Sequence, residues 1–157
     1  MSDAHGQGSY QVRFDWGSVG AAAIRSDAHL VVWVDQLGGV AVAPEPAPAG
    51  DDVMTATLET AADVAAFALA RQTELGGRFT IAVVAAGATR PDGSLRFAVE
   101  DLLAAGAVIE ALAALGIDHQ SPEAAAAASA FAGLKNATRH LISASASSRE
   151  ARESPEA

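Results

Sequence analysis

Two carboxylates stand side by side at Glu100 and Asp101, after an apolar run that reaches a glycine turn at Gly87 and a second turn at Pro91-Asp92-Gly93. Carboxylates near a strand end can hold a hard cation such as Mg²⁺. Adjacent side chains on a helix diverge by about 100°, so we expect at most one of the two to be a direct ligand. The alternative is that both acids stabilise a helix N-terminus through its dipole, by about 0.3 to 1 kcal/mol each.

A third carboxylate, Asp35, ends the continuous apolar run 30–34. A run of β-branched and aromatic residues is typical of a strand buried on both faces, as in a parallel sheet. An aspartate at the end of such a strand can coordinate magnesium or act at a phosphate. It can equally cap the loop that follows. Both interpretations of Asp35 stay open from the sequence.

Arginines lie close to these turns at Arg13, Arg90 and Arg96. A phosphate or sulfonate ligand needs charged hydrogen-bond donors of this kind. Most exposed arginines are nevertheless only solvated. Asp15, which stands just before Gly17, is expected to cap the helix that follows it.

To position these residues, the chain must alternate strands with helices. Hydrophobic periodicity and breaker residues predict strands over 10–14, 30–34, 39–43 and 79–86, and helices over 18–25, 57–75, 95–115 and 121–143. This order predicts a layered α/β/α fold with a mixed or largely parallel sheet. We expect one domain over 10–144, between a flexible start at 1–9 and a disordered tail at 145–157.

Composition narrows the function classes. A net charge of -9 disfavours a nucleic-acid partner, because binding to nucleic acid requires a clustered basic face. With no cysteine, the chain has no disulfide and no thiolate nucleophile. No leader-like segment or long apolar span stands out, so we expect a cytoplasmic protein without a membrane partner.

Four sequence patterns in the second half resemble one family: Ala-Gly at 86–87, Pro-Asp-Gly-Ser-Leu-Arg at 91–96, Val-Glu-Asp-Leu-Leu at 99–103 and Gly-Ala-Val-Ile at 106–109. Val-Arg-Phe-Asp-Trp-Gly at 12–17 adds a fifth. The chain thereby resembles the 2-phosphosulfolactate phosphatases, the ComB-like proteins, in their actinobacterial form. The similarity covers most of 10–44 and 57–150, in a form shortened relative to the family.

The resemblance implies magnesium-dependent hydrolysis of 2-phosphosulfolactate to 3-sulfolactate and phosphate, a step associated with coenzyme M biosynthesis. It implies Asp35 and Glu100 as catalytic residues, and both of them together with Asp101 as metal ligands. The residues implied to bind a small phosphorylated or sulfonated acid are Gly87, Arg90 and Arg96.

The chain also departs from the family pattern. Ala88-Thr89 stands where relatives carry Glu-Arg, and the middle section with a phosphate-loop-like motif is missing. Arg90 can replace the arginine from one position away, but nothing replaces the glutamate. The alternative is therefore a catalytically impaired relative that serves as a binding module, or a structural subunit whose sheet edges are covered by homo-oligomerisation.

Overall fold

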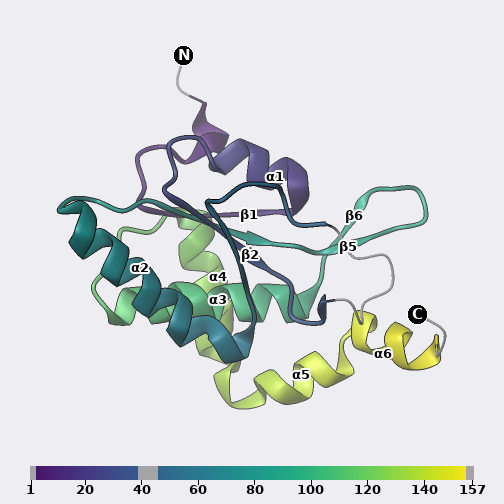
Figure 1. Ribbon diagram of the computed structural model, residues 1–157. Helices are drawn as coiled ribbons and strands as arrows, with labels where there is room; N and C mark the ends of the chain where they lie inside the picture. Colours follow the sequence, from purple (N-terminus) through teal and green to yellow (C-terminus); the bar gives the residue numbers. More distant parts are fainter. Residues whose placement is uncertain (1–2, 39–45, 155–157) are drawn as a thin grey trace.

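Four parallel strands form the central sheet of the computed structural model, which describes residues 3–38 and 46–154 (Figure 1). They are β1 (Val12–Trp16), β2 (Leu30–Val34), β3 (Val53–Ala56) and β4 (Ile81–Ala85). Their order across the sheet is β1-β4-β2-β3. The two central strands, β2 and β4, are buried along their whole length, as their continuous apolar sequences predict.

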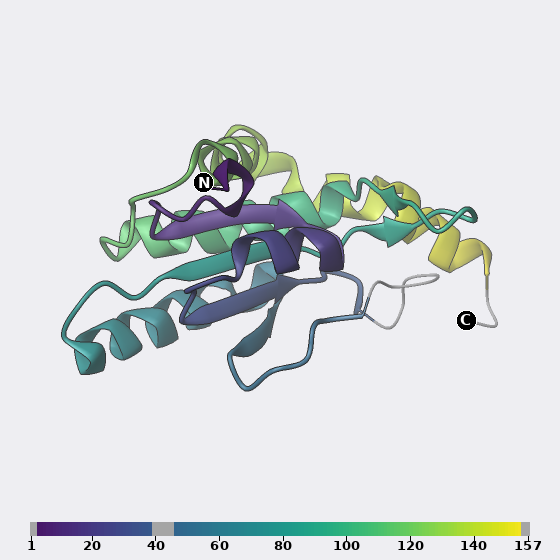
Figure 2. The same ribbon diagram turned by 90° about the horizontal axis from the view of Figure 1, so that it is seen from above.

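Helices cover both faces of this sheet. The helix α1 (Gly17–Ile24) lies on one face, and three helices lie on the other: α2 (Ala61–Leu75), α3 (Val99–Ala114) and α4 (Pro122–Leu134) (Figures 1 and 2). Alternate residues of β2 divide between the two layers, because side chains alternate along a strand. Val31 and Trp33 pack with α1, whereas Val32 and Val34 join the larger core. The predicted α/β/α layering is confirmed.

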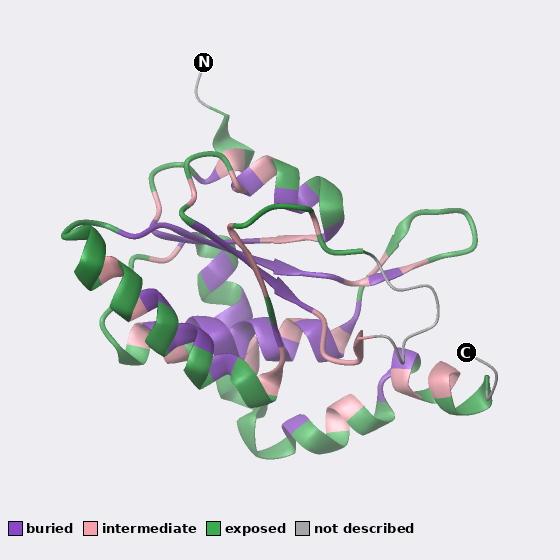
Figure 3. Ribbon diagram, viewed as in Figure 1, coloured by how far each residue is buried: buried purple, intermediate pink, exposed green. Residues whose placement is uncertain are grey.

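Burial is concentrated in the strands and in the helix sides that face them (Figure 3). The helix α3 is the most buried helix of the larger layer and includes Gly106, where α4 approaches closely. A Cβ built on Gly106 would lie 2.3 Å from the carbonyl oxygen of Ala127. Because Gly106 has no side chain, the backbone of α4 can lie directly against α3 at this position.

Several elements differ from the sequence prediction. The helix expected from Leu95 starts only at Val99, because a short hairpin precedes it, made of β5 (Ala88–Thr89) and β6 (Leu95–Arg96). The helix expected over 121–143 is divided into α4, a turn of 3-10 helix and α5 (Thr138–Ala144). The strand β3 was not predicted, since Val53-Met54-Thr55-Ala56 is too short to show a clear period. The strand predicted at 39–43 falls outside the described residues.

The tail, which we expected to be disordered, forms the helix α6 (Ala146–Glu153). Ser145 caps it by accepting a hydrogen bond from the backbone N–H of Ser148. Glu150 in α6 forms an ion pair with Arg96 of the hairpin at 2.7 Å. A cap and an ion pair to a distant segment thus order a polar stretch whose composition alone suggests disorder. The start of the chain is also structured, with a turn of 3-10 helix at Ala4–Gly6.

The outer edge of β1 is closed by the chain itself. The Val12 N–H donates to the carbonyl of His119, and the side chain of Gln7 both accepts from the Phe14 N–H and donates to the Phe14 carbonyl. The Trp16 N–H donates to Asp15. An edge strand with its groups paired internally does not invite another strand. The homo-oligomer expected to cover exposed edges therefore gains no support from β1.

Candidate functional site at the carboxyl edge of the sheet

The three predicted carboxylates gather where β2 and β4 end. Asp35 follows β2 directly, while Glu100 and Asp101 lie in the first turn of α3. The chain leaves β4 through Gly87, makes the short hairpin and returns to begin α3 above the ends of both strands. In parallel sheets this edge is the usual location of ligand sites.

Asp101 joins the two central strands. One carboxylate oxygen accepts from the Gln36 N–H at 2.8 Å, and the other accepts from the Gly87 N–H at 2.9 Å. The side chain is 2% exposed. Because both oxygens are engaged with backbone donors, Asp101 is a positioning residue that fixes the start of α3 against the strand ends. The prediction that it is a metal ligand gains no support from this geometry.

Burial, and to a lesser extent like charges, raise the pKa values at this edge. Burial raises the pKa of Asp101 to about 8, and the charges of Glu100 and Asp35 add to the rise, against the two N–H donors that lower it. Burial also raises the pKa of Asp35, with a further contribution from Glu100. No arginine or lysine contributes to either shift. Within the described part of the chain, the cluster therefore lacks a compensating positive charge.

Glu100 is only 3% exposed. Among the residues that the structure describes, none donates a hydrogen bond to its carboxylate. No buried side-chain oxygen or nitrogen of the described residues lacks a hydrogen-bond partner, so the oxygens of the Glu100 carboxylate retain some access to solvent. Glu100 and Asp101 thus play different parts, as the divergence of neighbouring side chains on a helix predicts.

Asp35 caps its own loop. One of its carboxylate oxygens accepts from the Gly38 N–H at 2.9 Å. The Leu37 N–H also donates to this carboxylate and, like the Gly38 N–H, lowers its pKa. The capping interpretation is confirmed. Both oxygens of Asp101 are engaged with N–H groups from other segments, so Asp35 and Glu100 are the carboxylates of the cluster that remain as candidate cation ligands. Across residues 3–38 and 46–154, however, no set of three or more acidic or histidine side chains is arranged to hold a metal ion.

Gln36 is a site residue that sequence reasoning missed. Its side chain accepts from the Leu58 N–H at 2.6 Å and donates to Glu59 at 3.0 Å, while its backbone N–H donates to Asp101. It ties the end of β2 to the segment that follows β3. The sequence signal that could have identified Gln36 is its position directly after Asp35, the aspartate that follows a strand.

The predicted anion-binding residues are all engaged with other groups of the protein. Arg90 donates to the Leu95 carbonyl and to Ser94 within the hairpin, and Arg96 pairs with Glu150. The Gly87 N–H already donates to Asp101. The structure thus brings Asp35, Glu100 and Asp101 together but leaves the arginines outside the cluster, because the hairpin carries them away from the strand ends.

Two further residues of β1 bond to the neighbouring backbone. Arg13 is 3% exposed and donates to the carbonyls of Ile24 and Ser26 among others, so it holds the turn after α1. Asp15 accepts from the Trp16 N–H, and no side chain caps α1. The prediction that Asp15 caps this helix is wrong, because the carboxylate turns back to the neighbouring backbone.

Comparisons with protein-family models, curated proteins and solved structures found no match for this chain. Membership of the 2-phosphosulfolactate phosphatase family therefore stays a prediction that rests on the sequence patterns. None of the described helices has the length and apolar character needed to cross a membrane.

Proposed function

We propose that this edge of the sheet binds a divalent cation, and through it a small phosphorylated acid whose phosphoester the protein hydrolyses. The observation that supports the proposal is the uncompensated group of carboxylates formed by Asp35, Glu100 and Asp101, with Glu100 almost fully buried. A divalent cation placed against it would remove the mutual repulsion. The sequence resemblance to 2-phosphosulfolactate phosphatases points to the same chemistry.

Magnesium fits the donors that remain. It is commonly held by one or two carboxylates together with substrate phosphate and several waters. Asp35 and Glu100 supply that number, whereas both oxygens of Asp101 are occupied by backbone N–H groups. When bound, magnesium would supply polarisation of the phosphoryl oxygens. Asp35 and Glu100 would hold it, and Asp101 would keep the start of α3 in place.

The anion side of the site requires the arginines to be released. The ion pair between Arg96 and Glu150 joins side chains that are 32% and 43% exposed. Such a pair contributes at most about 1 kcal/mol, so an anionic ligand can compete for Arg96. Arg90 is exposed, and the hydrogen bonds that it makes to described residues lie within its hairpin. Both guanidinium groups are therefore available at low free-energy cost.

A second candidate function is binding without catalysis. It is favoured by the engagement of Gly87, Arg90 and Arg96 with other groups of the protein. In that case the carboxylates bind a cation or a cation-ligand complex, and the phosphoryl group is not stabilised for transfer.

The test measures phosphate release from 2-phosphosulfolactate and from a panel of small phosphoesters, with and without magnesium, in parallel with calorimetric magnesium binding. The variants are Asp35→Asn and Glu100→Gln, and the matched control is Glu110→Gln, an exposed acid further along α3. We expect magnesium-dependent release that falls at least about a hundredfold in the two site variants and is unchanged in the control. Magnesium binding that the site variants abolish, without any phosphate release, identifies the binding module. The absence of both activities in the wild-type protein refutes the proposal.

A further inference from the structure

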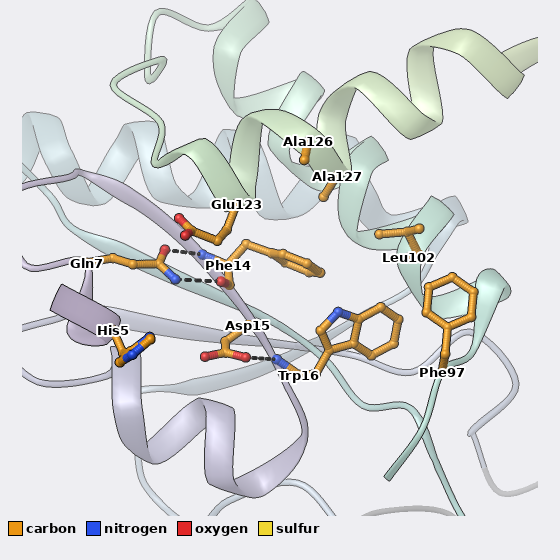
Figure 4. A pocket seen from close by; sticks show the side chains of 10 residues that line it. All are labelled: His5, Gln7, Phe14, Asp15, Trp16, Phe97, Leu102, Glu123, Ala126 and Ala127. Carbon is orange, nitrogen blue, oxygen red and sulfur yellow. Dashed lines mark hydrogen bonds between the residues drawn. The ribbon is translucent and has the colours of Figure 1, made fainter.

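A cavity of about 460 Å³ lies along the outer edge of β1, between the start of α4 and the segment that leads into α3 (Figure 4). Its volume falls in the range of small-molecule sites, about 300 to 1,000 Å³. None of the carboxylates Asp35, Glu100 and Asp101 lines it. It is therefore a second candidate site, independent of the proposed hydrolysis.

Aromatic rings form one wall of this cavity. The ring centroids of Phe14 and Trp16 are 5.9 Å apart with the planes at 72°, and those of Trp16 and Phe97 are 5.2 Å apart at 42° (Figure 4). Phe97 is 59% exposed, whereas an aromatic side chain usually packs in the core, and the chain has few aromatic residues. A large apolar side chain left open to solvent beside a cavity gains burial when a ligand enters.

Two carboxylates line the same cavity, Asp15 from β1 and Glu123 from the first turn of α4. No lysine or arginine lines it, and its third ionisable group is His5. Among described residues, Glu123 forms no ion pair, and Asp15 only accepts from the Trp16 N–H at 2.7 Å. The cavity therefore carries a negative potential and disfavours phosphorylated or sulfonated acids.

The Asp15 carboxylate is held in place before any ligand binds. It lies over Gly20 of α1, where a built Cβ would be 2.8 Å from its Cγ and Oδ1 atoms. Any side chain at position 20 would displace the carboxylate, whereas glycine leaves the space for it. Together with the Trp16 N–H, this packing holds one charged wall of the cavity in a single orientation. A group that is already ordered loses less entropy when a ligand binds.

We propose that this cavity binds a small organic ammonium ion that carries an aromatic or apolar group. The faces of Trp16 and Phe97 attract a cation and also cover the apolar part of the ligand. Asp15 and Glu123 neutralise the ammonium charge. Charge complementarity and the aromatic wall thus select an organic cation over a neutral molecule of the same shape.

The experiment compares benzylammonium with benzyl alcohol, which has nearly the same shape without the charge, by titration calorimetry and tryptophan fluorescence. The chain has two tryptophans, and Trp33 is buried in the core, so a ligand-dependent change in emission reports on Trp16. We expect benzylammonium to bind at least about tenfold more tightly than benzyl alcohol and to change the emission. Equal binding of the two probes, or no binding of benzylammonium, overturns the proposal.

Variants test whether Asp15 and Glu123 cause the preference for benzylammonium over benzyl alcohol. We expect Glu123→Gln and Asp15→Asn each to weaken benzylammonium binding several-fold and to leave benzyl alcohol binding unchanged. Glu123 is exposed, so its variant keeps the fold even if the Asp15 variant does not. The matched control is Glu110→Gln, on a helix surface outside the cavity, which should bind as the wild type does. Unaltered benzylammonium binding in Glu123→Gln with Asp15→Asn combined refutes the role of the carboxylates.

Discussion

The close approach of α3 and α4 at Gly106 can be tested directly by the substitution Gly106→Ala. A Cβ at this position would lie 2.3 Å from the Ala127 carbonyl oxygen and 2.7 Å from the Phe131 Cβ, whereas ordinary contact begins near 3.4 Å. The first obstacle is backbone, so no rotation of a side chain relieves it. The substitution must move α3 and α4 apart by roughly 1 Å or bend one of them.

The size of the effect follows from two opposing terms. Inserting a methyl group into a filled interface destabilises by about 1 to 3 kcal/mol, and the backbone obstacle places this case at the upper end. Replacing glycine by alanine inside a helix gains up to about 1 kcal/mol. We therefore expect Gly106→Ala to lower the free energy of unfolding by about 2 kcal/mol, which corresponds to a fall in Tm of roughly 4 to 8 °C for a chain of this size.

Urea unfolding followed by circular dichroism measures this difference, provided that the slope m is unchanged. Gly133→Ala is the matched control, because Gly133 also lies in a helix, α4, but a Cβ there meets no atom within 4 Å. The control should be as stable as the wild type or up to about 1 kcal/mol more stable. If Gly106→Ala behaves like this control, the close approach of α3 and α4 is refuted.

Two further perturbations test the region around the strand ends. Because burial raises the pKa of Asp101 to about 8, the folded protein retains a proton there that the unfolded chain releases above pH ~4. The free energy of unfolding should therefore fall as pH rises from ~4 to ~8, by at most ~1.4 kcal/mol per pH unit. In Asp101→Asn, unfolding curves measured between pH 5 and 7 should lack this dependence on pH. An equal pH dependence in the variant and the wild type would contradict the raised pKa of Asp101. Arg13→Met removes the donors to the buried Ile24 carbonyl and to the partly buried Ser26 carbonyl. Calorimetry should therefore show a loss of roughly 3 kcal/mol, against under about 0.5 kcal/mol for the exposed Arg71→Met. A small effect at Arg13 would mean that its carbonyl contacts do not hold the turn.

Much of the fold could be predicted because its central elements are locally unambiguous. The run Leu30–Val34 is apolar at every position, which favours a strand covered on both faces, and β2 has these bounds. The signal Ser121-Pro122 sets the start of α4, and Ser121 accepts the hydrogen bond of Ala124 as a cap should. The elements that were missed depend on distant partners. The strand β3 is paired with β2, and α6 is joined to the hairpin by the ion pair between Glu150 and Arg96.

The candidate site was predictable in position but not in detail. Strand ends and a helix start bring Asp35, Glu100 and Asp101 to one edge, as the parallel topology requires. The sequence could not show that Asp101 would use both oxygens on backbone N–H groups, because those donors come from Gln36, which follows β2, and Gly87, which follows β4. It also could not show that the hairpin would direct Arg90 and Arg96 elsewhere. Both outcomes depend on the paths of the segments that follow β2 and β4.

The two proposed sites select ligands of opposite charge, so an experiment can show that one proposal is wrong without affecting the other. A phosphorylated acid at Asp35 and Glu100 needs a cation as intermediary, since carboxylates alone repel it. An organic ammonium ion beside Asp15 and Glu123 needs none. Magnesium should therefore strengthen binding of a phosphoester at the first site and leave benzylammonium binding at the second unchanged. A protein that binds benzylammonium but neither magnesium nor phosphoesters would have its working site along β1, with the carboxylates near Asp101 serving only to join the strands to α3.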